Sequence, residues 1–317
     1  MLNRRILRVK VMQALYAFYQ SDERNPDAGL QRLFSGIDKL YELYLFLLWQ
    51  LCETADFETS NNEEKQQHLQ ILIHPHASEN TSRKLLSNQL LADLNSNAWF
   101  RKTLFDHKVH LLGDPEVTHR LFLSVRNSEV YQNWQSAENT SYEDDKKLII
   151  AVFGIIINQS SFESYVEEKN IYWADEQEFL YGVVQKTLES FSPKAKDPLL
   201  RSAFRDEEDD RVFAKEVFLK TLAHNGEYEA MIREKVENWE LERITLTDVI
   251  LIKMALTEVM YIPSVPVKVS INEYIDISKD YSSPKSKAFI NGIIDKIVQE
   301  LKAEGKFLKT GRGLLEQ

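Results

Sequence analysis

The chain has 317 residues, of which 28% are charged and 43% are hydrophobic, and its formal net charge at pH 7 is −10. This length and composition are ordinary for a water-soluble globular protein and exclude a chain too short or too polar to bury a core. Only 10 glycines and 8 prolines are present, fewer than average usage would give. Because hairpins, Rossmann turns and barrels need many glycines, this scarcity favours an all-α fold.

Cysteine usage and the hydrophobic runs predict a soluble, cytoplasmic protein. The lone cysteine, Cys52, cannot form an intramolecular disulfide, which suits a reducing compartment. The first residues run straight into a charged amphipathic stretch that lacks the apolar region of a signal peptide. The most hydrophobic runs, Leu43–Leu48 and Leu148–Ile157, are far shorter than the ~20 residues that span a bilayer.

Apolar residues recur at helical spacing along most of the chain. Asn3 has the residue type of an N-cap for the first helix. The second helix is predicted to end near Phe57, because a polar run from Glu58 to His68 breaks the periodicity, and His74-Pro75-His76 is predicted to lie in a turn. Helices are expected over residues 3–20, 28–57, 79–110, 114–135, 144–169, 174–191, 211–239, 249–261, 270–279 and 283–304.

Three short patterns predict helix starts in the last third of the chain. Thr245-Leu-Thr-Asp248 and Ser270-Ile-Asn-Glu273 are capping-box patterns. Ser283-Pro284 supplies an N-cap and a first helical residue. Upstream, the segment 192–210 holds Ser-Pro, Asp-Pro and an acidic run, and therefore predicts an exposed joint between two parts of the chain.

The helix expected over residues 249–261 is apolar nearly all round. A helix of this kind is usually buried in the centre of a bundle. Its polar positions, Asp248 and Lys253, are therefore expected where the helix reaches the surface.

Motifs that carry chemistry are missing from the sequence, which predicts a protein that is not an enzyme and has no cofactor. There is no P-loop, no Gly-rich dinucleotide fingerprint and no nucleophile elbow, and one cysteine cannot build a Cys-rich zinc site. His107 and His110 stand three residues apart, but nothing nearby completes a ligand set, so a solvated pair is favoured over a metal site. The acidic run Glu207–Asp210 is similarly interpreted as a hydrated loop and not as a cation site.

The net charge argues against a nucleic-acid partner, but the charge distribution does not. Residues 1–12 contain four basic and no acidic side chains, and residues 261–317 contain nine basic against seven acidic ones. On a helix, Arg5, Arg8, Gln13, Tyr16 and Tyr19 share one arc, which combines guanidiniums for phosphates with rings for stacking. This pattern fits a single-stranded RNA site, and it also fits an ordinary amphipathic helix with a basic start.

Four blocks in the same order resemble the NusB family. They are Arg4-Arg5-x-x-Arg8 with Gln13-Ala-Leu-Tyr16, Ala255-Leu-Thr-Glu-Val259, Val265-Pro-Val-Lys-Val-Ser-Ile-Asn-Glu273 and Lys287-Ala-Phe-Ile-Asn-Gly-Ile-Ile-Asp-Lys296. The chain departs from the family pattern where Ile6 and Leu7 dilute the arginine-rich start, where Lys285 adds a cation, and where Tyr274 replaces a small residue.

The resemblance implies a NusB-like helical bundle, made of two packed three-helix bundles, with an inserted helical subdomain. Residues 1–24 would be the first helix of the NusB-like domain and residues 203–304 its remainder. Residues 25–202 would be a helical insertion of unknown role, and residues 305–317 a basic tail.

The resemblance also implies a function. The family binds boxA-like single-stranded RNA of ribosomal leaders together with the ribosomal protein NusE, and joins the RNA polymerase antitermination complex. By resemblance, Asp248 and Lys253 would lie near the partner-protein surface, whereas Asn291, Gly292 and Asp295 are expected to be structural, with Gly292 allowing close helix packing. The residues that would contact RNA are Arg4, Arg5, Arg8, Gln13, Tyr16, Lys285, Lys287 and Phe289.

Two alternatives remain open. A NusB-like domain also occurs as an accessory module of RNA cytosine methyltransferases, but that arrangement needs a Gly-rich catalytic half, which residues 25–202 do not offer. The other alternative is a helical protein-interaction adaptor that works through the insertion.

Overall fold

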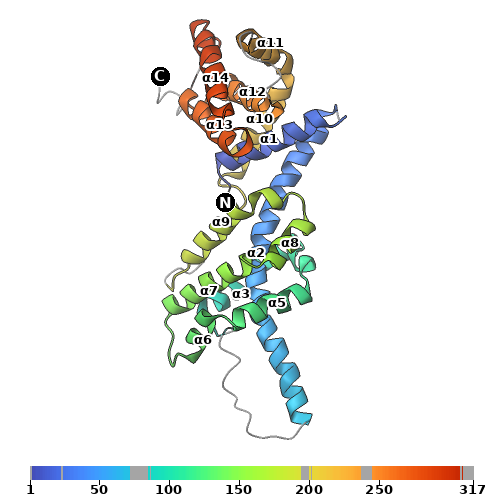
Figure 1. Ribbon diagram of the computed structural model, residues 1–317, viewed down its shortest axis with the longest axis vertical. Helices are drawn as coiled ribbons and strands as arrows, with labels where there is room; N and C mark the ends of the chain where they lie inside the picture. Colours follow the sequence, from blue (N-terminus) through green and yellow to red (C-terminus); the bar gives the residue numbers. More distant parts are fainter. Residues whose placement is uncertain are drawn as a thin grey trace. The chain divides into compact units, whose positions relative to one another are not determined.

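The computed structural model describes residues 2–22, 24–71, 85, 87–193, 200, 202–236, 245–307 and 309. Within these ranges every regular element is a helix (Figure 1), which confirms the predicted all-α fold. The α-helices are α1 (Arg4–Gln20), α2 (Pro26–Ile71), α3 (Gln89–Ser96), α4 (Ala98–Asp106), α5 (Pro115–Arg126), α6 (Glu129–Ser136), α7 (Tyr142–Ile157), α8 (Ser160–Lys169), α9 (Gln177–Glu189), α10 (Glu207–Ala223), α11 (Asn225–Val236), α12 (Leu246–Tyr261), α13 (Val267–Tyr281) and α14 (Ser286–Ala303), and the short 3₁₀ helices are η1 (Val109–Leu112) and η2 (Ala174–Glu176).

The helices form two compact units. The first unit comprises Met1–Ile37 and Ala203–Gln317, and the second comprises Asp38–Ser202. The first unit thus joins two segments that are far apart in the sequence, α1 with the beginning of α2, and α10 to α14. The second unit is one continuous segment.

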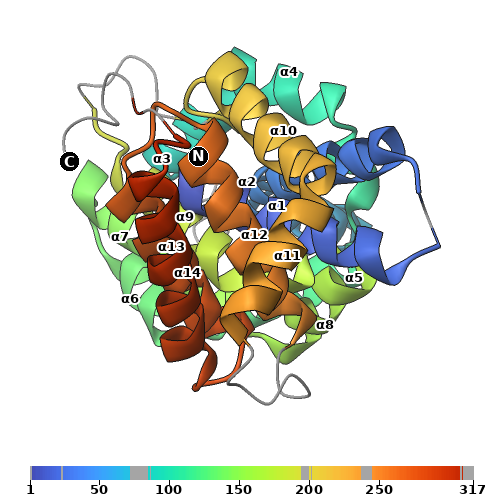
Figure 2. The ribbon, with the colours of Figure 1, turned by 90° about the horizontal axis from the view of Figure 1, so that it is seen from above.

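In the first unit, α12 is the central helix. It packs against α1, α10, α11, α13 and α14, and Figure 2 shows it among these neighbours. Every residue from Ile250 to Val259 is buried, which confirms the prediction that this apolar helix lies at the centre of a bundle. Because these five helices all pack against α12, this helix fixes the positions of the candidate site residues that they carry.

In the second unit, α7 packs against α3, α5, α6, α8 and α9. The long helix α2 contributes aromatic residues to the same core. Phe46 stacks on Phe162 and Trp173 at ring-centroid distances of 6.2 and 5.6 Å, and the hydroxyl of Tyr44 hydrogen-bonds to that of Thr187 over 3.1 Å. The second unit therefore has a hydrophobic core of its own.

Several expected helix boundaries were wrong. Helix α2 continues to Ile71, because the polar run after Phe57 has no helix-breaking glycine or proline. The single helix expected over residues 79–110 is divided into α3, α4 and η1, since Asn88 and Asn97 each accept backbone N–H groups as N-caps. The turn expected at His74-Pro75-His76 lies outside the described residues.

Two of the three predicted caps were also wrong. Thr245 caps α12 as predicted, its hydroxyl accepting the N–H of Asp248 over 3.2 Å. By contrast, α13 begins after Pro266, so Ser270 lies inside the helix and its hydroxyl is used elsewhere. Helix α14 begins at Ser286 with Lys285 at the cap position, so Ser283 and its proline lie in the preceding turn.

Among the described residues, no single helix is long and apolar enough to cross a membrane. By length and composition alone, α7 and α8 taken together pass as a span bent by 71°.

Candidate nucleic-acid interface

Helix α1 is anchored at its first turn and along its apolar face. The side chain of Asn3 accepts the N–H of Ile6 over 3.0 Å, as predicted for an N-cap, and the N–H of Leu2 donates to the carbonyl of Ala203 over 2.8 Å. The predicted apolar stripe faces the core, where α1 packs against α10, α12 and α13. Arg4 and Arg5 emerge beside the acidic start of α10 and the acidic face of α13.

Arg4 lies against the first turn of α10. Its guanidinium contacts the carboxylates of Asp209 at 2.6 Å and Asp210 at 3.2 Å, and lies 4.0 Å from the ring centroid of Phe213. The acidic run that the sequence suggested as a hydrated loop is the first turn of α10, where carboxylates interact favourably with the helix dipole. Arg4 is thus held mainly by α10.

Arg5 is the most exposed of the arginines that start α1. Its side chain is 45% exposed and forms ion pairs with Glu273 at 3.1 Å and Asp276 at 2.8 Å, both on α13. Hydrogen bonds to these carboxylates, Glu273 first, raise the pKa of Arg5 above its ordinary value. Exposed ion pairs of this kind contribute only about 0–1 kcal/mol, so the guanidinium can exchange these partners for others.

Arg8 is buried at the centre of a polar network, with 2% of its surface exposed. Its guanidinium binds both carboxylate oxygens of Glu258, at 2.9 and 2.6 Å, and also reaches Glu273 at 3.4 Å. The hydroxyls of Ser270 and Tyr274 donate to the same Glu258 carboxylate, at 2.8 and 3.0 Å. Burial lowers the pKa of Arg8, but the charge and hydrogen bonds of Glu258, together with Tyr274 and Glu273, outweigh this effect and raise the pKa overall.

The expectation that Arg8 shares an exposed arc with Arg5 was therefore wrong. The helical angle places both side chains on neighbouring faces of α1, but α13 covers Arg8. The tyrosine that replaces a small residue of the family pattern, Tyr274, is fully buried and completes the hydrogen bonding of Glu258. Its burial raises the pKa of its hydroxyl well above the ordinary value.

Further along α1, the predicted contact residues differ in exposure. Gln13 is half-buried and accepts a hydrogen bond from the ammonium of Lys10 over 3.0 Å. Tyr16 is 42% exposed. Arg5 and Tyr16 are eleven residues apart, which at about 100° per residue returns them to nearly the same side of the helix. A guanidinium and a ring therefore face solvent on one side of α1, about 16 Å apart along the axis.

The start of α14 supplies two more predicted cations. Lys285, at the cap position, and Lys287, in the first turn, are both exposed. Phe289 is buried, with 7% of its surface exposed, and belongs to the apolar stripe of α14. Stacking of a base on Phe289 is thus contradicted by its burial in the core.

A buried carboxylate fixes the turn that carries these lysines. Asp248, on α12, accepts hydrogen bonds from the hydroxyls of Ser282 and Ser286, the latter over 2.9 Å. Ser283 and Ser286 are joined by a further bond of 2.8 Å between their hydroxyls. Asp248 therefore ties α12 to the loop between α13 and α14 and holds the start of α14 in place.

The other predicted partner-protein residue, Lys253, is buried as well. Its ammonium donates to Asn225 over 2.6 Å and to Glu229 over 2.8 Å, and lies 5.2 Å from the ring centroid of Tyr19. The hydrogen bond from Lys253 is the main cause of a lowered pKa at Glu229. Lys253 thus joins α12 to α11 and α1.

Asp248 and Lys253 are 2% and 3% exposed, so the expectation that they mark the surface of α12 was wrong. Each is satisfied inside the fold by partners that lie outside α12. Their polarity reflects buried hydrogen bonding and not contact with solvent.

Of the three residues on α14 that were expected to be structural, Asn291 and Asp295 bond to each other, whereas Gly292 has no packing role. The side-chain amide of Asn291 donates to the carboxylate of Asp295 over 3.0 Å, one turn further along the same helix. A Cβ built on Gly292 would meet no neighbouring atom within 4 Å. Close helix packing is therefore not the reason for a glycine at position 292.

One residue of the basic tail within the described ranges is also buried. The ammonium of Lys309 donates to the carbonyls of Glu258 and Ile262, at 3.0 and 3.1 Å, at the end of α12. Burial lowers the pKa of Lys309 to about 8. A cation at this position satisfies the terminal carbonyls of the central helix.

Glu258 is a buried residue that the sequence pattern alone did not single out as important. A fully buried acid needs a buried cation. The presence of a glutamate inside an apolar helix was therefore the signal in the sequence that could have indicated this ion pair. Among the described residues no group of three or more His, Cys, Asp or Glu side chains could hold a metal ion. His107 and His110 instead pack on aromatic rings, Tyr41 and Phe105 respectively.

Comparison with known proteins gives a family match that covers α9 to α14. The sequence pattern of the NusB family matches residues 177–299. The match therefore begins in the second unit and continues through most of the first unit's C-terminal segment.

Three curated relatives carry the name Transcription antitermination protein NusB. The one from Salinibacter ruber is 41% identical over 117 residues, which are 37% of this chain and 73% of the relative. The one from Listeria monocytogenes is 34% identical over 104 residues, 33% of this chain and 80% of the relative. The one from Chloroherpeton thalassium is 46% identical over 85 residues, 27% of this chain and 40% of the relative. No solved structure matches the chain.

Proposed function

Because this chain belongs to the NusB family, we propose that it is an RNA-binding transcription antitermination factor. It binds boxA-like single-stranded RNA of ribosomal leaders together with NusE and joins the RNA polymerase antitermination complex. It acts by recruitment and catalyses no reaction. The name shared by its relatives supports the antitermination role.

The observation that carries the RNA assignment is the exposure of Arg5 and Tyr16 on one side of α1. A guanidinium can bind a phosphate, and a phenol ring can stack on a base, which together suit a single strand. The exposed lysines at the start of α14, Lys285 and Lys287, belong to the same compact unit and add positive charge.

Within this proposal the predicted RNA-binding residues have different roles. Arg5, Tyr16, Lys285 and Lys287 contact RNA directly, and Arg4 and Gln13 lie at the margin of the site. Arg8 is a positioning residue, because it binds Glu273, which also binds Arg5. The buried Phe289 shapes the helix that carries the lysines.

The proposal also assigns the parts of the chain. Residues 1–24 and 203–304 form the NusB-like domain, and residues 25–202 form a helical insertion. Asp248 and Lys253 stabilise the domain from inside, so NusE binds a surface that does not include their side chains.

The triple variant Arg5→Ala, Lys285→Ala, Lys287→Ala is expected to bind single-stranded RNA more weakly and with a flatter salt dependence. For a single strand, each phosphate that a cation neutralises steepens the slope of log K against log salt by about 0.7, so removing these cations flattens it. The slope is measured by fluorescence anisotropy of a labelled boxA-like RNA at several salt concentrations.

Lys302→Ala is the matched control, because this lysine is exposed in the last turn of α14, far from its start. The control should keep the wild-type slope. A triple variant with the slope and affinity of the wild type would show that these cations do not bind RNA.

A further inference from the structure

Helix α4 and the short helix η1, both in the second unit, expose two large aromatic rings and a histidine. Phe105 is 72% exposed and Trp99 is 43% exposed. His110 is exposed and stacks on Phe105 with a centroid distance of 6.0 Å and an interplanar angle of 8°. Large exposed aromatics forgo the free energy that burial would give, so a group of them on one helix points to a partner.

The cations of α4 lie on the same side as these rings. Phe100 is buried and fixes the side of α4 that faces the core. At about 100° per residue, Phe105 falls between Arg101 and Lys102 on the opposite side, and Asp106 and then Trp99 follow Lys102 around the helix. All five are exposed. The solvent side of α4 therefore carries two cations and two rings, with one carboxylate between Lys102 and Trp99.

The link between α4 and η1 extends this surface. Lys108 is exposed and adopts a left-handed backbone conformation, with φ of 55°, that is uncommon for a residue with a side chain. This conformation turns the chain so that the ring of His110 comes back against Phe105. We name the group formed by Trp99, Arg101, Lys102, Phe105, Lys108 and His110 the α4 surface.

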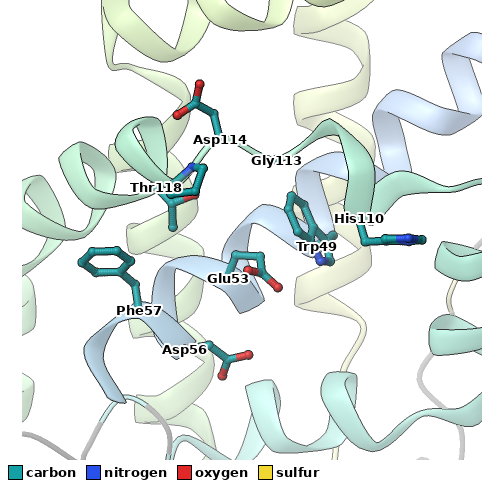
Figure 3. Close-up of a pocket in the computed structure, with 9 residues that line it drawn as sticks. Trp49, Glu53, Asp56, Phe57, His110, Gly113, Asp114 and Thr118 are labelled. Carbon is teal, nitrogen blue, oxygen red and sulfur yellow. The ribbon is translucent and has the colours of Figure 1, made fainter. Parts of the chain in front are cut away.

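An acidic pocket bounds the α4 surface on one side. It has a volume of about 250 Å³ and is lined by Trp49, Glu53 and Asp56 of α2, by His110 of η1 and by Gly113 and Asp114 of the η1–α5 connection. Figure 3 shows the ring of His110 pointing away from the carboxylates of Glu53 and Asp56. The ring stacks instead on Phe105 of α4, while the carboxylates would repel a phosphate that approached the pocket.

We propose that the α4 surface is a second contact site for single-stranded RNA, located in the insertion. Cations beside stacking rings are the recognition chemistry of such sites, because every base has a face that can stack and every nucleotide carries a phosphate. Of the side chains of α4, only Asp106 is acidic, although the chain as a whole has a net charge of −10. This local excess of positive charge favours a polyanion over a neutral apolar partner.

This inference rests on the proposed function and extends it to a part of the chain that the family pattern leaves unexplained. The α4 surface binds bases and phosphates of its own, beyond those that reach α1 and α14. A protein partner that docks on these rings is the competing outcome, and it would need their apolar area but not their aromatic character.

The test is photo-crosslinking of the full chain to a single-stranded RNA of about 12 nucleotides that carries 4-thiouridine, followed by identification of the crosslinked peptides. Crosslinks in residues 98–112 are expected in addition to those in α1 or α14. Phe105→Leu, which keeps apolar area but removes the ring, should lower the crosslinking at α4 about tenfold. Phe105→Tyr should preserve it.

Ile171→Ala is the matched control, because Ile171 is an 83% exposed apolar residue elsewhere in the second unit. This variant should crosslink like the wild type. Crosslinks only in α1 or α14 would overturn the α4 site and leave the proposed function standing. Crosslinks only at α4 would leave the α4 site standing and overturn the RNA contacts proposed for α1 and α14. Equal crosslinking of Phe105→Leu and wild type, or no crosslinks at all, would also overturn the α4 site.

Discussion

Arg8→Ala is expected to lower the free energy of unfolding by about 3–5 kcal/mol, the usual cost of removing one partner from a buried ion pair. The variant leaves the carboxylate of Glu258 inside the first unit without its cation. The hydroxyls of Ser270 and Tyr274 remain as donors, but they carry no charge. Urea denaturation followed by circular dichroism measures the difference.

Two further variants separate this effect from the loss of an ordinary surface arginine. Arg5→Ala removes an exposed side chain whose ion pairs contribute only about 0–1 kcal/mol, and should be close to wild type in stability. Adding Glu258→Gln to Arg8→Ala removes the unpaired charge and should recover part of the loss. Equal stability of the Arg8→Ala and Arg5→Ala proteins would show that the buried pair does not stabilise the fold.

Asp248→Ala is expected to be the second most damaging change, with a loss of about 2–3 kcal/mol. Hydrogen bonds to a buried charged group contribute about 1.5–3 kcal/mol each, and their loss is offset in part by relief of the buried charge. The hydroxyls of Ser282 and Ser286 would lose their acceptor. Thermal melting of the purified variant measures the loss.

The same change should also weaken RNA binding, because the loop that holds Lys285 and Lys287 is no longer fixed to α12. Asp248→Asn keeps an oxygen that can accept one hydrogen bond and should fall between Asp248→Ala and wild type in both measurements. An Asp248→Ala protein with the same melting temperature as the wild type would contradict the role assigned to this carboxylate.

The sequence predicts the core of this fold well because burial follows apolar periodicity. The uninterrupted apolar character of the helix from Val249 to Tyr261 correctly placed it at the centre of a bundle. The stripe on the first helix correctly placed that helix against the core. These predictions need only the local pattern and the helical repeat.

Polar residues inside the fold were predicted poorly, because their partners lie far away in the sequence. Lys253 is satisfied by residues of α11, and Asp248 by serines near the start of α14. Arg8 is covered by α13, near the other end of the sequence. Helical angle alone cannot separate a solvated cation from one that a distant helix buries, so the assignment of the RNA-binding residues remains a prediction.

The predicted positions of helix ends were wrong where helix propensity and capping patterns indicated different boundaries. The polar stretch after Phe57 lacks apolar periodicity but consists of residues that a helix tolerates, and α2 continues through it. Ser270 has the spacing of a capping box, but Pro266 precedes the helix and starts it one turn earlier.

The central claim is that this member of the NusB family binds boxA-like RNA together with NusE. Its most direct test is equilibrium filter binding of the full chain to a boxA-like single-stranded RNA and to a scrambled RNA of equal length, each with and without NusE. We expect tighter binding to the boxA-like RNA and a further gain when NusE is present. Equal affinity for both RNAs, with no effect of NusE, would contradict the claim.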